Sequence, residues 1–180
     1  MSIKYSFCPK CGDKLKISKH ENKPRLQCGA CGFVFYQNAK PTASVLIEND
    51  KGEILLTRRA IEPFKGYWDT AGGFCEEDEH PEIAARREIK EELGVEVELT
   101  GLIGIIMDRY GDDGDWTINM YYSGRIKSGE IKPADDIDDY QWFSLDSLPN
   151  VAFKSGKKAL DTLKNIRAKE SDKLGKAGKG

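Results

Sequence analysis

Four cysteines near the start of the chain impose the strongest constraint on how it folds. They form two Cys-x-x-Cys pairs, Cys8/Cys11 and Cys28/Cys31, with sixteen residues between the pairs. This spacing is typical of a tetrahedral zinc site with four thiolate ligands. About forty residues bury too little apolar surface to fold alone, and a bound metal ion supplies the missing free energy. We therefore expect a small zinc module over residues 1–38, with all four cysteines as ligands.

Two other interpretations of these cysteines stay open, namely two disulfides and a redox-active Cys-x-x-Cys pair. The N-terminus lacks the continuous apolar segment of a secretory signal, which favours reduced thiols and zinc. Four thiolates fill the coordination shell of zinc, so the expected site is structural rather than catalytic. The fifth cysteine, Cys75, lies in an acidic segment and is expected to be a small filler residue rather than a nucleophile.

Charge is distributed unevenly along the 180 residues. The formal net charge of -2 combines +6 over residues 1–40, -14 over 41–152 and +6 over 153–180. This distribution excludes a uniformly basic surface for nucleic acid. The basic N-terminal module could contact an anionic substrate or RNA, or its charges could simply be solvated; both interpretations stay open. The longest apolar run, 102–107, is too short to cross a bilayer. We expect a soluble, cytoplasmic protein without membrane contact.

Hydrophobic periodicity and turn residues divide the rest of the chain into strands and helices. Expected strands cover 43–49, 53–57, 95–107, 117–126 and 141–144, and expected helices cover 81–93 and 152–168. The first two strands flank the turn Asp50-Lys51-Gly52 and are expected to pair as a hairpin. Pro81 suits the first turn of its helix, and Gly94 is a natural stop. Residues 169–180 lack periodic apolar positions and are expected to form a flexible basic tail.

Three carboxylates are concentrated on one face of the first expected helix. Glu88, Glu91 and Glu92 stand at i, i+3 and i+4, so they share that face and repel one another. Hard divalent cations with oxygen ligands would remove this repulsion. The alternative is a solvated acidic stripe; the glycines and Glu79 at fixed offsets favour metal binding.

The segment 73–95 resembles the Nudix hydrolase family. In the family's box, Gly73 is followed after five residues by Glu79, and after seven more by the run from Arg87 to Val95. Every defined position of that box is matched: Gly73, Glu79, Arg87, Glu88, Ile89, Glu91, Glu92, Gly94 and Val95. The resemblance implies an α+β fold, an α/β/α sandwich with a mixed β-sheet over residues 39–168, preceded by a zinc ribbon.

The family resemblance also implies the roles of the box residues. In this family the loop and helix hold Mg²⁺ or Mn²⁺ against a diphosphate, and the implied ligands are the Gly73 carbonyl with Glu88, Glu91, Glu92 and a further acidic residue, Asp136. The implied catalytic residues are Glu88 as general base, Glu92 as the carboxylate that could exchange roles with it, and Arg87, which orients Glu88. Glu79 and Gly94 are structural. For Asp136, which stands six residues before Trp142, a plain acidic loop remains an equal alternative.

Candidate substrate contacts lie in the strand and loop before the box. Cationic candidates for the outer phosphates are Arg58, Arg59 and Lys65. Aromatic candidates for stacking a base are Trp68, Phe64 and Tyr110, for which core packing is the alternative.

Together these features predict hydrolysis of a nucleoside diphosphate linked to another moiety, with ADP-ribose or a related nucleoside diphosphate sugar favoured. The zinc ribbon resembles the NADH pyrophosphatase branch of the family, which also acts on NAD-capped RNA. Its Ser-Gln-Pro-Trp-Pro-Phe-Pro segment has no counterpart between residues 95 and 116. NAD(H), NAD-capped RNA and nucleoside triphosphates remain alternatives, as does a nucleotide-sensing or docking module without turnover. A homodimer is compatible with the apolar strands.

Overall fold

The computed structural model describes residues 5–177, and side chains as far as residue 173. The chain divides into two compact units, with the boundary between Asn38 and Ala39. The two units are described separately.

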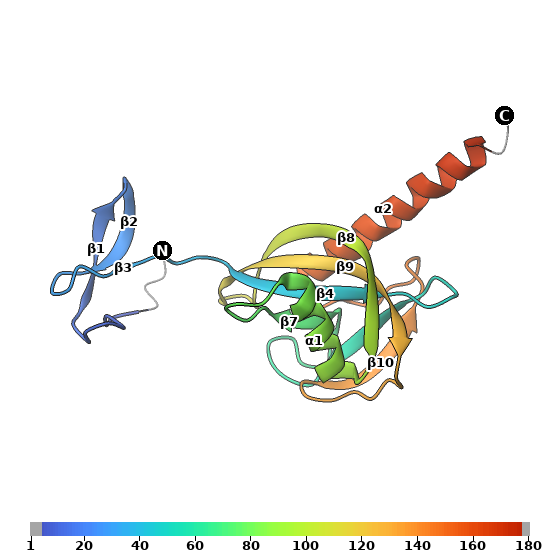
Figure 1. The fold of residues 1–180 in the computed structure, drawn as a ribbon, viewed down its shortest axis with the longest axis horizontal. Coiled ribbons are helices and arrows are strands. Elements are labelled where there is room, and N and C mark those ends of the chain that lie inside the picture. Colours follow the sequence, from blue (N-terminus) through green and yellow to red (C-terminus); the bar gives the residue numbers. More distant parts are fainter. Residues whose placement is uncertain (1–4, 178–180) are drawn as a thin grey trace. The chain divides into compact units, whose positions relative to one another are not determined.

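The first unit is a three-stranded antiparallel sheet beside a cluster of cysteines. Strands β1 (Leu15–His20) and β2 (Lys23–Cys28) form a hairpin, and the short β3 (Val34–Phe35) pairs with β2 (Figure 1). Its small apolar core consists of Cys8, Leu15, Leu26 and Cys28, with Cys31, Phe33 and Phe35 packed against it. So few apolar side chains leave this unit dependent on what the cysteines bind.

The second unit contains two sheets and two helices. The larger sheet has the order β7-β4-β9-β8, formed by Ala71–Phe74, Lys40–Ile47, Trp116–Ser128 and Glu96–Arg109. Only β4 and β9 run parallel, so this sheet is mixed. The smaller sheet has the order β10-β5-β6, formed by Ile137–Phe143, Ile54–Arg59 and Trp68–Asp69. Helices α1 (Pro81–Leu93) and α2 (Lys154–Ala177) complete the α+β fold.

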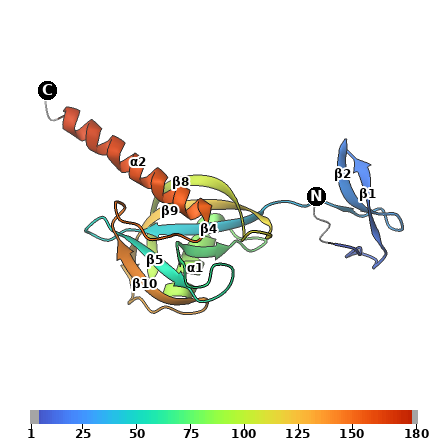
Figure 2. The ribbon, with the colours of Figure 1, turned by 180° about the vertical axis from the view of Figure 1, so that it is seen from behind.

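Alternating side chains of β4 separate two hydrophobic cores. Val45 belongs to the core that contains Ile89 of α1, whereas Leu46 belongs to the core that contains Leu160 of α2. Successive strand residues point to opposite faces, so one apolar strand serves both layers. Figures 1 and 2, which view the molecule from opposite sides, show α1 and α2 on opposite sides of the sheet. The expected α/β/α sandwich with a mixed sheet is confirmed.

The expected hairpin between the first two strands of this unit is wrong. The two strands form no ladder with each other; the pairing beside the turn is an isolated bridge between Glu48, the residue after β4, and Ile54 of β5. Both edges of β4 are occupied, by β7 and by β9, and β5 pairs with β10 and β6 instead. A short turn between two apolar strands therefore connects two sheets.

Helix α1 begins and ends where the sequence predicts. His80 is the N-cap, and its Nδ1 accepts a hydrogen bond from the Glu82 N–H at 3.3 Å. Pro81 has no backbone N–H, but a residue in the first turn of a helix has no acceptor for one, so proline fits there. Gly94 ends the helix with a left-handed φ of 71°. These local signals fix the direction in which the helical carboxylates point.

Helix α2 continues to Ala177, so the expected helix end at residue 168 is wrong, while the flexibility of the basic tail over 169–180 stays a prediction. Lys, Glu, Leu and Ala, which have high helix propensity, make up six of residues 169–177, and the side chains of 169–173 are exposed. Residues 178–180 lie outside the described part. Among the described helices, none is long and apolar enough to cross a membrane.

Candidate active site

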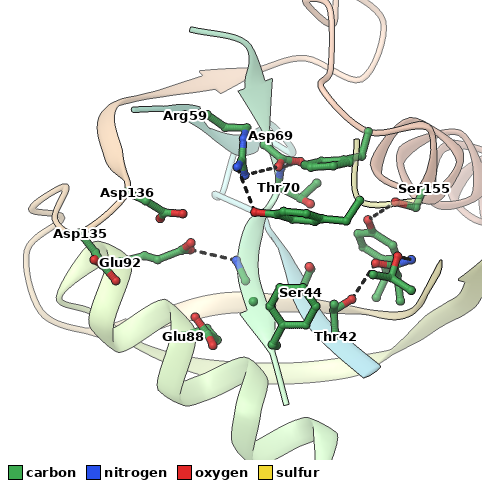
Figure 3. A pocket seen from close by; sticks show the side chains of 18 of the residues that line it. Thr42, Ser44, Arg59, Asp69, Thr70, Glu88, Glu92, Asp135, Asp136 and Ser155 are labelled. Atoms are coloured by element: carbon green, nitrogen blue, oxygen red, sulfur yellow. Dashed lines mark hydrogen bonds and ion pairs between the residues drawn. The ribbon is translucent and has the colours of Figure 1, made fainter. Parts of the chain in front are cut away.

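A pocket of about 230 Å³ opens beside α1 in the second unit (Figure 3). It is lined by β4, β7, β9, the start of α2 and the loop before β10, as well as by α1. Its lining residues include Thr42, Ser44, Arg59, Asp69, Gly73, Glu88, Glu92, Tyr110, Asn119, Asp135, Asp136, Phe153 and Ser155. Figure 3 shows the carboxylates of α1 and of the loop on one side and the hydroxyls of β4 on the other.

Glu92 is the most buried carboxylate of α1, with 7% of its surface exposed. The backbone N–H of Gly72 donates a hydrogen bond to Glu92 Oε2 at 2.9 Å. Desolvation raises the pKa of Glu92 well above its ordinary value, and the Gly72 N–H offsets only part of this effect. The neighbouring carboxylates of Asp136, Glu88 and Asp69 raise that pKa further. Without a cation the site therefore favours the neutral form of Glu92, because the Gly72 N–H offsets only part of the burial and the neighbouring charges.

Glu88 lies one turn earlier, directly against the backbone of Gly73. A Cβ atom placed on Gly73 would come within 2.5 Å of Glu88 Cδ and Oε2. Burial raises the pKa of Glu88, while its bond to Arg87 acts in the opposite direction. Glycine at this position lets the loop and the helical carboxylate approach each other closely.

Arg87 connects the loop to the helix through five hydrogen bonds. Its guanidinium donates to both oxygens of Glu79, each at 2.9 Å, and to Glu88 Oε1 at 2.8 Å. It also donates to Glu91 Oε2 at 3.0 Å and to the Phe74 carbonyl at 3.0 Å. These carboxylates raise the pKa of Arg87, Glu79 most of all, so the side chain stays charged. Arg87 thus sets the position of Glu88 without lining the pocket itself.

Asp136 brings a third carboxylate to the pocket from the loop before β10 (Figure 3). The Ala60 N–H donates to the Asp136 carbonyl at 2.7 Å, which holds the loop against the end of β5. Neighbouring Asp135, with a left-handed φ of 58°, also lines the pocket. Glu91 is not among the lining residues; its side chain is 51% exposed and pairs with Arg87.

The pocket carboxylates suit a hard divalent cation. Glu88, Glu92 and Asp136 offer only oxygen donors, and the Gly73 backbone lies beside Glu88. A cation among them would stabilise the charged forms that burial disfavours. In the described part of the chain only the four cysteines place three or more ligand atoms within 4.8 Å of one another, so the carboxylates are spaced more widely.

Two of the substrate contacts expected from the sequence, Arg59 and Tyr110, line the pocket. Arg58, Lys65, Trp68 and Phe64 do not. Arg58 points to the other face of β5, where its Nε donates to Asp138 Oδ1 at 2.7 Å. Trp68 packs against Phe143 in the core on the α2 side, with ring centroids 5.0 Å apart. Adjacent strand residues face opposite ways, so only one arginine of the pair reaches the pocket.

Arg59 is held by a set of contacts at one end of the pocket. Its NH1 lies 3.4 Å from Asp69 Oδ2, its NH2 donates to the Tyr110 hydroxyl at 3.3 Å, and its Nε donates to the Pro63 carbonyl at 2.7 Å. Tyr110 stacks on Phe153 with centroids 5.4 Å apart and an interplanar angle of 21°. Asp69 and Phe153 were not among the expected site residues.

A wall of buried hydroxyl and amide groups, also not expected, lies opposite the carboxylates. Thr42 Oγ1 donates to Asn119 Oδ1 at 2.7 Å, and Tyr121 donates to Ser155 Oγ at 3.1 Å. Ser44 lines the same side. The signal was present in the sequence as polar residues at every second position within apolar strands, namely 42 and 44 in β4 and 117 and 119 in β9.

Asp69 gives the stability of this unit a distinctive pH dependence. Desolvation raises the pKa of Asp69 from 3.8 to about 6, although Arg59 opposes the shift. A raised pKa contributes stability that is fully present below pH 3.8 and is lost as the pH rises through 6. The unfolding free energy of the wild type minus that of Asp69→Asn should therefore fall by about 3 kcal/mol between about pH 3 and pH 7. Urea titrations of both proteins at each pH measure this difference in unfolding free energy. A difference that does not change with pH would contradict the raised pKa of Asp69.

In the first unit the four cysteine sulfurs form the cluster expected for zinc. Cys8 Sγ lies 3.6 Å from Cys31 Sγ, and Cys11 Sγ lies 3.5 Å from Cys28 Sγ. Sulfurs bound to one tetrahedral zinc ion at about 2.3 Å are about 3.8 Å apart, so the geometry fits this ion. The backbone N–H of Cys31 lowers the pKa of the Cys28 thiol to about 7, which favours the thiolate.

Comparison with known proteins agrees with both units. A NUDIX domain model matches residues 38–163, and a Nudix N-terminal zinc-ribbon model matches residues 6–37. An NAD-capped RNA hydrolase, NudC, from Pseudomonas aeruginosa is 34% identical over 79% of this chain and 49% of its own length. The chain thus spans about half the length of that relative. An ADP-ribose pyrophosphatase from Methanocaldococcus jannaschii is 37% identical over 60% of this chain and 63% of its own.

Among solved structures, a NUDIX hydrolase from Nitrosomonas europaea superposes with a TM-score of 0.75 at 27% identity, covering 89% of each chain. The two family models together match residues 6–163, which include the four cysteines and the carboxylates of α1. The chain therefore belongs to the Nudix family and carries that family's N-terminal zinc ribbon ahead of its Nudix domain.

Proposed function

We propose that this protein is a diphosphatase that uses water to cleave the P–O–P bridge of a nucleoside diphosphate joined to a ribose-bearing group. The observation that carries the proposal is the meeting of Glu88, Glu92 and Asp136 in one pocket beside the backbone of Gly73. A sensing module without turnover would not need all three carboxylates at the positions that ligate cations.

Glu88 is the proposed general base. Its carboxylate takes a proton from a water molecule as the water oxygen attacks one phosphorus, and the bridging oxygen leaves with the other phosphate. Arg87 keeps Glu88 in place through the 2.8 Å bond and does not itself touch substrate. Glu92 is the alternative base; its burial and its bond to the Gly72 N–H fit a fixed ligand better.

Mg²⁺ or Mn²⁺ is the proposed cofactor, held by Glu88, Glu92, Asp136 and the Gly73 carbonyl. When bound, it neutralises charge on the diphosphate oxygens. Glu91, expected as a further ligand from the family resemblance, is paired with Arg87 on the exposed side of α1 and stays a prediction. Arg59 is the only cation among the described lining residues, and it offers its charge to the outer phosphate.

The hydroxyl and amide wall supports ADP-ribose or a related nucleoside diphosphate sugar as substrate. Ser44 and Ser155 offer hydroxyl groups in a buried setting, which suits the hydroxyls of a sugar. Thr42 and Asn119 add acceptor oxygens, since their own donors already bond within the wall and to the Ile106 carbonyl. The Methanocaldococcus relative is named an ADP-ribose pyrophosphatase. We expect kcat/KM for ADP-ribose to exceed that for nucleoside triphosphates, in a direct comparison of rates. Equal kcat/KM values for ADP-ribose and nucleoside triphosphates would contradict the proposal that the site recognises a sugar.

NAD(H), free or as an RNA cap, is a second candidate. The similarity to the NAD-capped RNA hydrolase of Pseudomonas aeruginosa extends over 79% of the chain. The stacked rings of Tyr110 and Phe153 also give the pocket a flat apolar surface suited to a base. The ratio of kcat/KM for NADH to that for ADP-ribose decides between the two substrates.

Gly73→Ala tests the close approach of loop and helix. The new Cβ would meet the Glu88 carboxylate at 2.5 Å, so Glu88 must move away from its position. We expect kcat to fall about a hundredfold, because misplacement by about 1 Å costs that much. Steady-state kinetics measure kcat, and circular dichroism checks that the fold is retained. Gly104→Ala, at a β8 glycine outside the pocket with no positive φ and open space where the new Cβ would lie, controls for replacement of a glycine. Unchanged turnover in Gly73→Ala would contradict the proposed role of Glu88.

A further inference from the structure

One face of the zinc-ribbon sheet carries several cations and no carboxylate. Strand alternation and the β1–β2 register place Lys16, Ser18, His20, Lys23, Arg25 and Gln27 on the same side, here called the basic face. The opposite side carries Leu15, Ile17 and Leu26. The two acidic residues of this unit, Asp13 and Glu21, precede β1 and occupy the turn, so neither has a position on the basic face.

The side chains of the basic face leave their donors available. Ser18 donates to Gln27 Oε1 at 2.6 Å, so this bond uses the acceptor of Gln27 and not its amide N–H groups. Arg25 Nε is buried and has no hydrogen-bond partner, so it is out of reach of a ligand, and Arg25 contributes its charge and planar guanidinium rather than this donor. Within the described part of the ribbon, no ion pair neutralises Lys16 or Lys23. A surface rich in donors and poor in acceptors is suited to an anion.

An aromatic ring lies beside these cations. The Arg25 guanidinium carbon lies 4.3 Å from the centroid of the Tyr36 ring, and the Tyr36 hydroxyl is 3.0 Å from His20 Nε2. Tyr36 remains 45% exposed. A planar guanidinium already stacked on an aromatic ring is a preformed platform for an unstacked base. Free phosphate would use the lysines but not this platform, whereas single-stranded nucleic acid uses both.

We propose that the basic face binds single-stranded RNA, with phosphates against Lys16 and Lys23 and a base against the Arg25–Tyr36 platform. This function is separate from turnover in the Nudix domain, although it would suit the NAD-capped RNA candidate above. A duplex fits less well, because its bases are stacked and cannot reach the platform.

The test uses the full-length zinc-loaded protein and an uncapped, 5′-monophosphorylated, fluorescent single-stranded RNA of twelve nucleotides, without Mg²⁺ or Mn²⁺. Fluorescence anisotropy over a range of salt concentrations gives Kd and the salt dependence. Lys16→Gln/Lys23→Gln should weaken binding at least tenfold at low salt and reduce the slope of log K against log salt by about 1.4. Lys10→Gln/Lys19→Gln removes the same charge away from the basic face and should change Kd by less than about twofold.

A further variant separates the platform from charge. Arg25→Lys keeps the charge but removes the planar group, so it should weaken RNA binding severalfold with the salt slope unchanged. Equal weakening by both lysine pairs, equal affinity for a twelve-base-pair DNA duplex, or no binding by the wild type would each overturn the proposal.

Zinc content and turnover of ADP-ribose are measured in every variant and should match the wild type. Suppose that neither the wild type nor any variant turns over a nucleotide, while RNA binding is weakened by the substitutions on the basic face and not by the control pair. The proposed diphosphatase function then fails and this inference stands. Turnover without RNA binding would overturn this inference and leave the diphosphatase function standing.

Discussion

Glu88→Gln should lower kcat about a thousandfold, because the amide cannot take the proton of the attacking water. Glutamine preserves the size of the side chain and can still accept the 2.8 Å bond from Arg87, so the loop should stay in place. The measurement is the steady-state rate with saturating Mg²⁺ or Mn²⁺, with substrate at several multiples of KM. A shift in KM alone would mean that Glu88 binds substrate rather than acting as base.

Glu92→Gln and Glu82→Gln complete this comparison on the same helix. Glu92 is buried beside Asp136, so loss of its charge should weaken binding of the divalent cation as well as lower kcat. The Glu82 side chain is half exposed in the first turn and pairs with Arg86, so Glu82→Gln should leave turnover within about twofold of the wild type. A metal titration of the rate separates Glu82→Gln, whose metal dependence should match the wild type, from the two variants of proposed ligands. Equal losses in Glu82→Gln and Glu88→Gln would point to helix stability instead of chemistry.

Loss of the zinc ligands should unfold the ribbon while the Nudix domain stays folded. In Cys8→Ser/Cys28→Ser, half of the four-sulfur cluster is gone, and structural zinc sites of this kind supply about 10–16 kcal/mol of apparent binding free energy. The core of the ribbon, formed largely by those two cysteines with Leu15 and Leu26, cannot replace that amount. Elemental analysis should show zinc falling from one ion per chain to none.

Amide spectra follow the two units separately in the same variant. Resonances of residues 5–38 should collapse to unfolded positions, and those of the Nudix domain should persist, since the hydrophobic cores of that domain do not include the ribbon. Cys75→Ser is the matched control and should keep both zinc and spectrum. A zinc-free wild type with four oxidised thiols would overturn the metal assignment.

Local signals in the sequence predict the helix that carries the site. Pro81 and Gly94 act within one or two turns, so the predicted bounds of α1 agree with those observed. Strand pairing depends on residues far away in the chain. The turn after β4 indicates a hairpin, yet β9 and β7 occupy both edges of β4.

On the substrate side of the pocket, the direction of single side chains is also hard to predict from the sequence. Arg58 and Arg59 are adjacent in sequence and equally basic, but they lie on opposite faces of β5. Arg59 therefore lines the pocket, whereas Arg58 binds Asp138. Which face of a strand is inward depends on the sheet it joins, and that sheet is assembled from distant segments. Asn119 is hard to predict for another reason, because a polar residue within an apolar strand is also the ordinary pattern of a half-exposed strand.

The most direct test is to follow ADP-ribose in H₂¹⁸O with Mg²⁺ or Mn²⁺ and identify the products by mass spectrometry. Water attack at one phosphorus and departure of the bridging oxygen predict AMP and ribose 5-phosphate in equal amounts, with one ¹⁸O atom in one of the two products. Glu88→Gln should form the same labelled products about a thousandfold more slowly. Release of inorganic phosphate, or intact ADP-ribose, NADH and sugar nucleotides after prolonged incubation, would contradict the proposed diphosphatase.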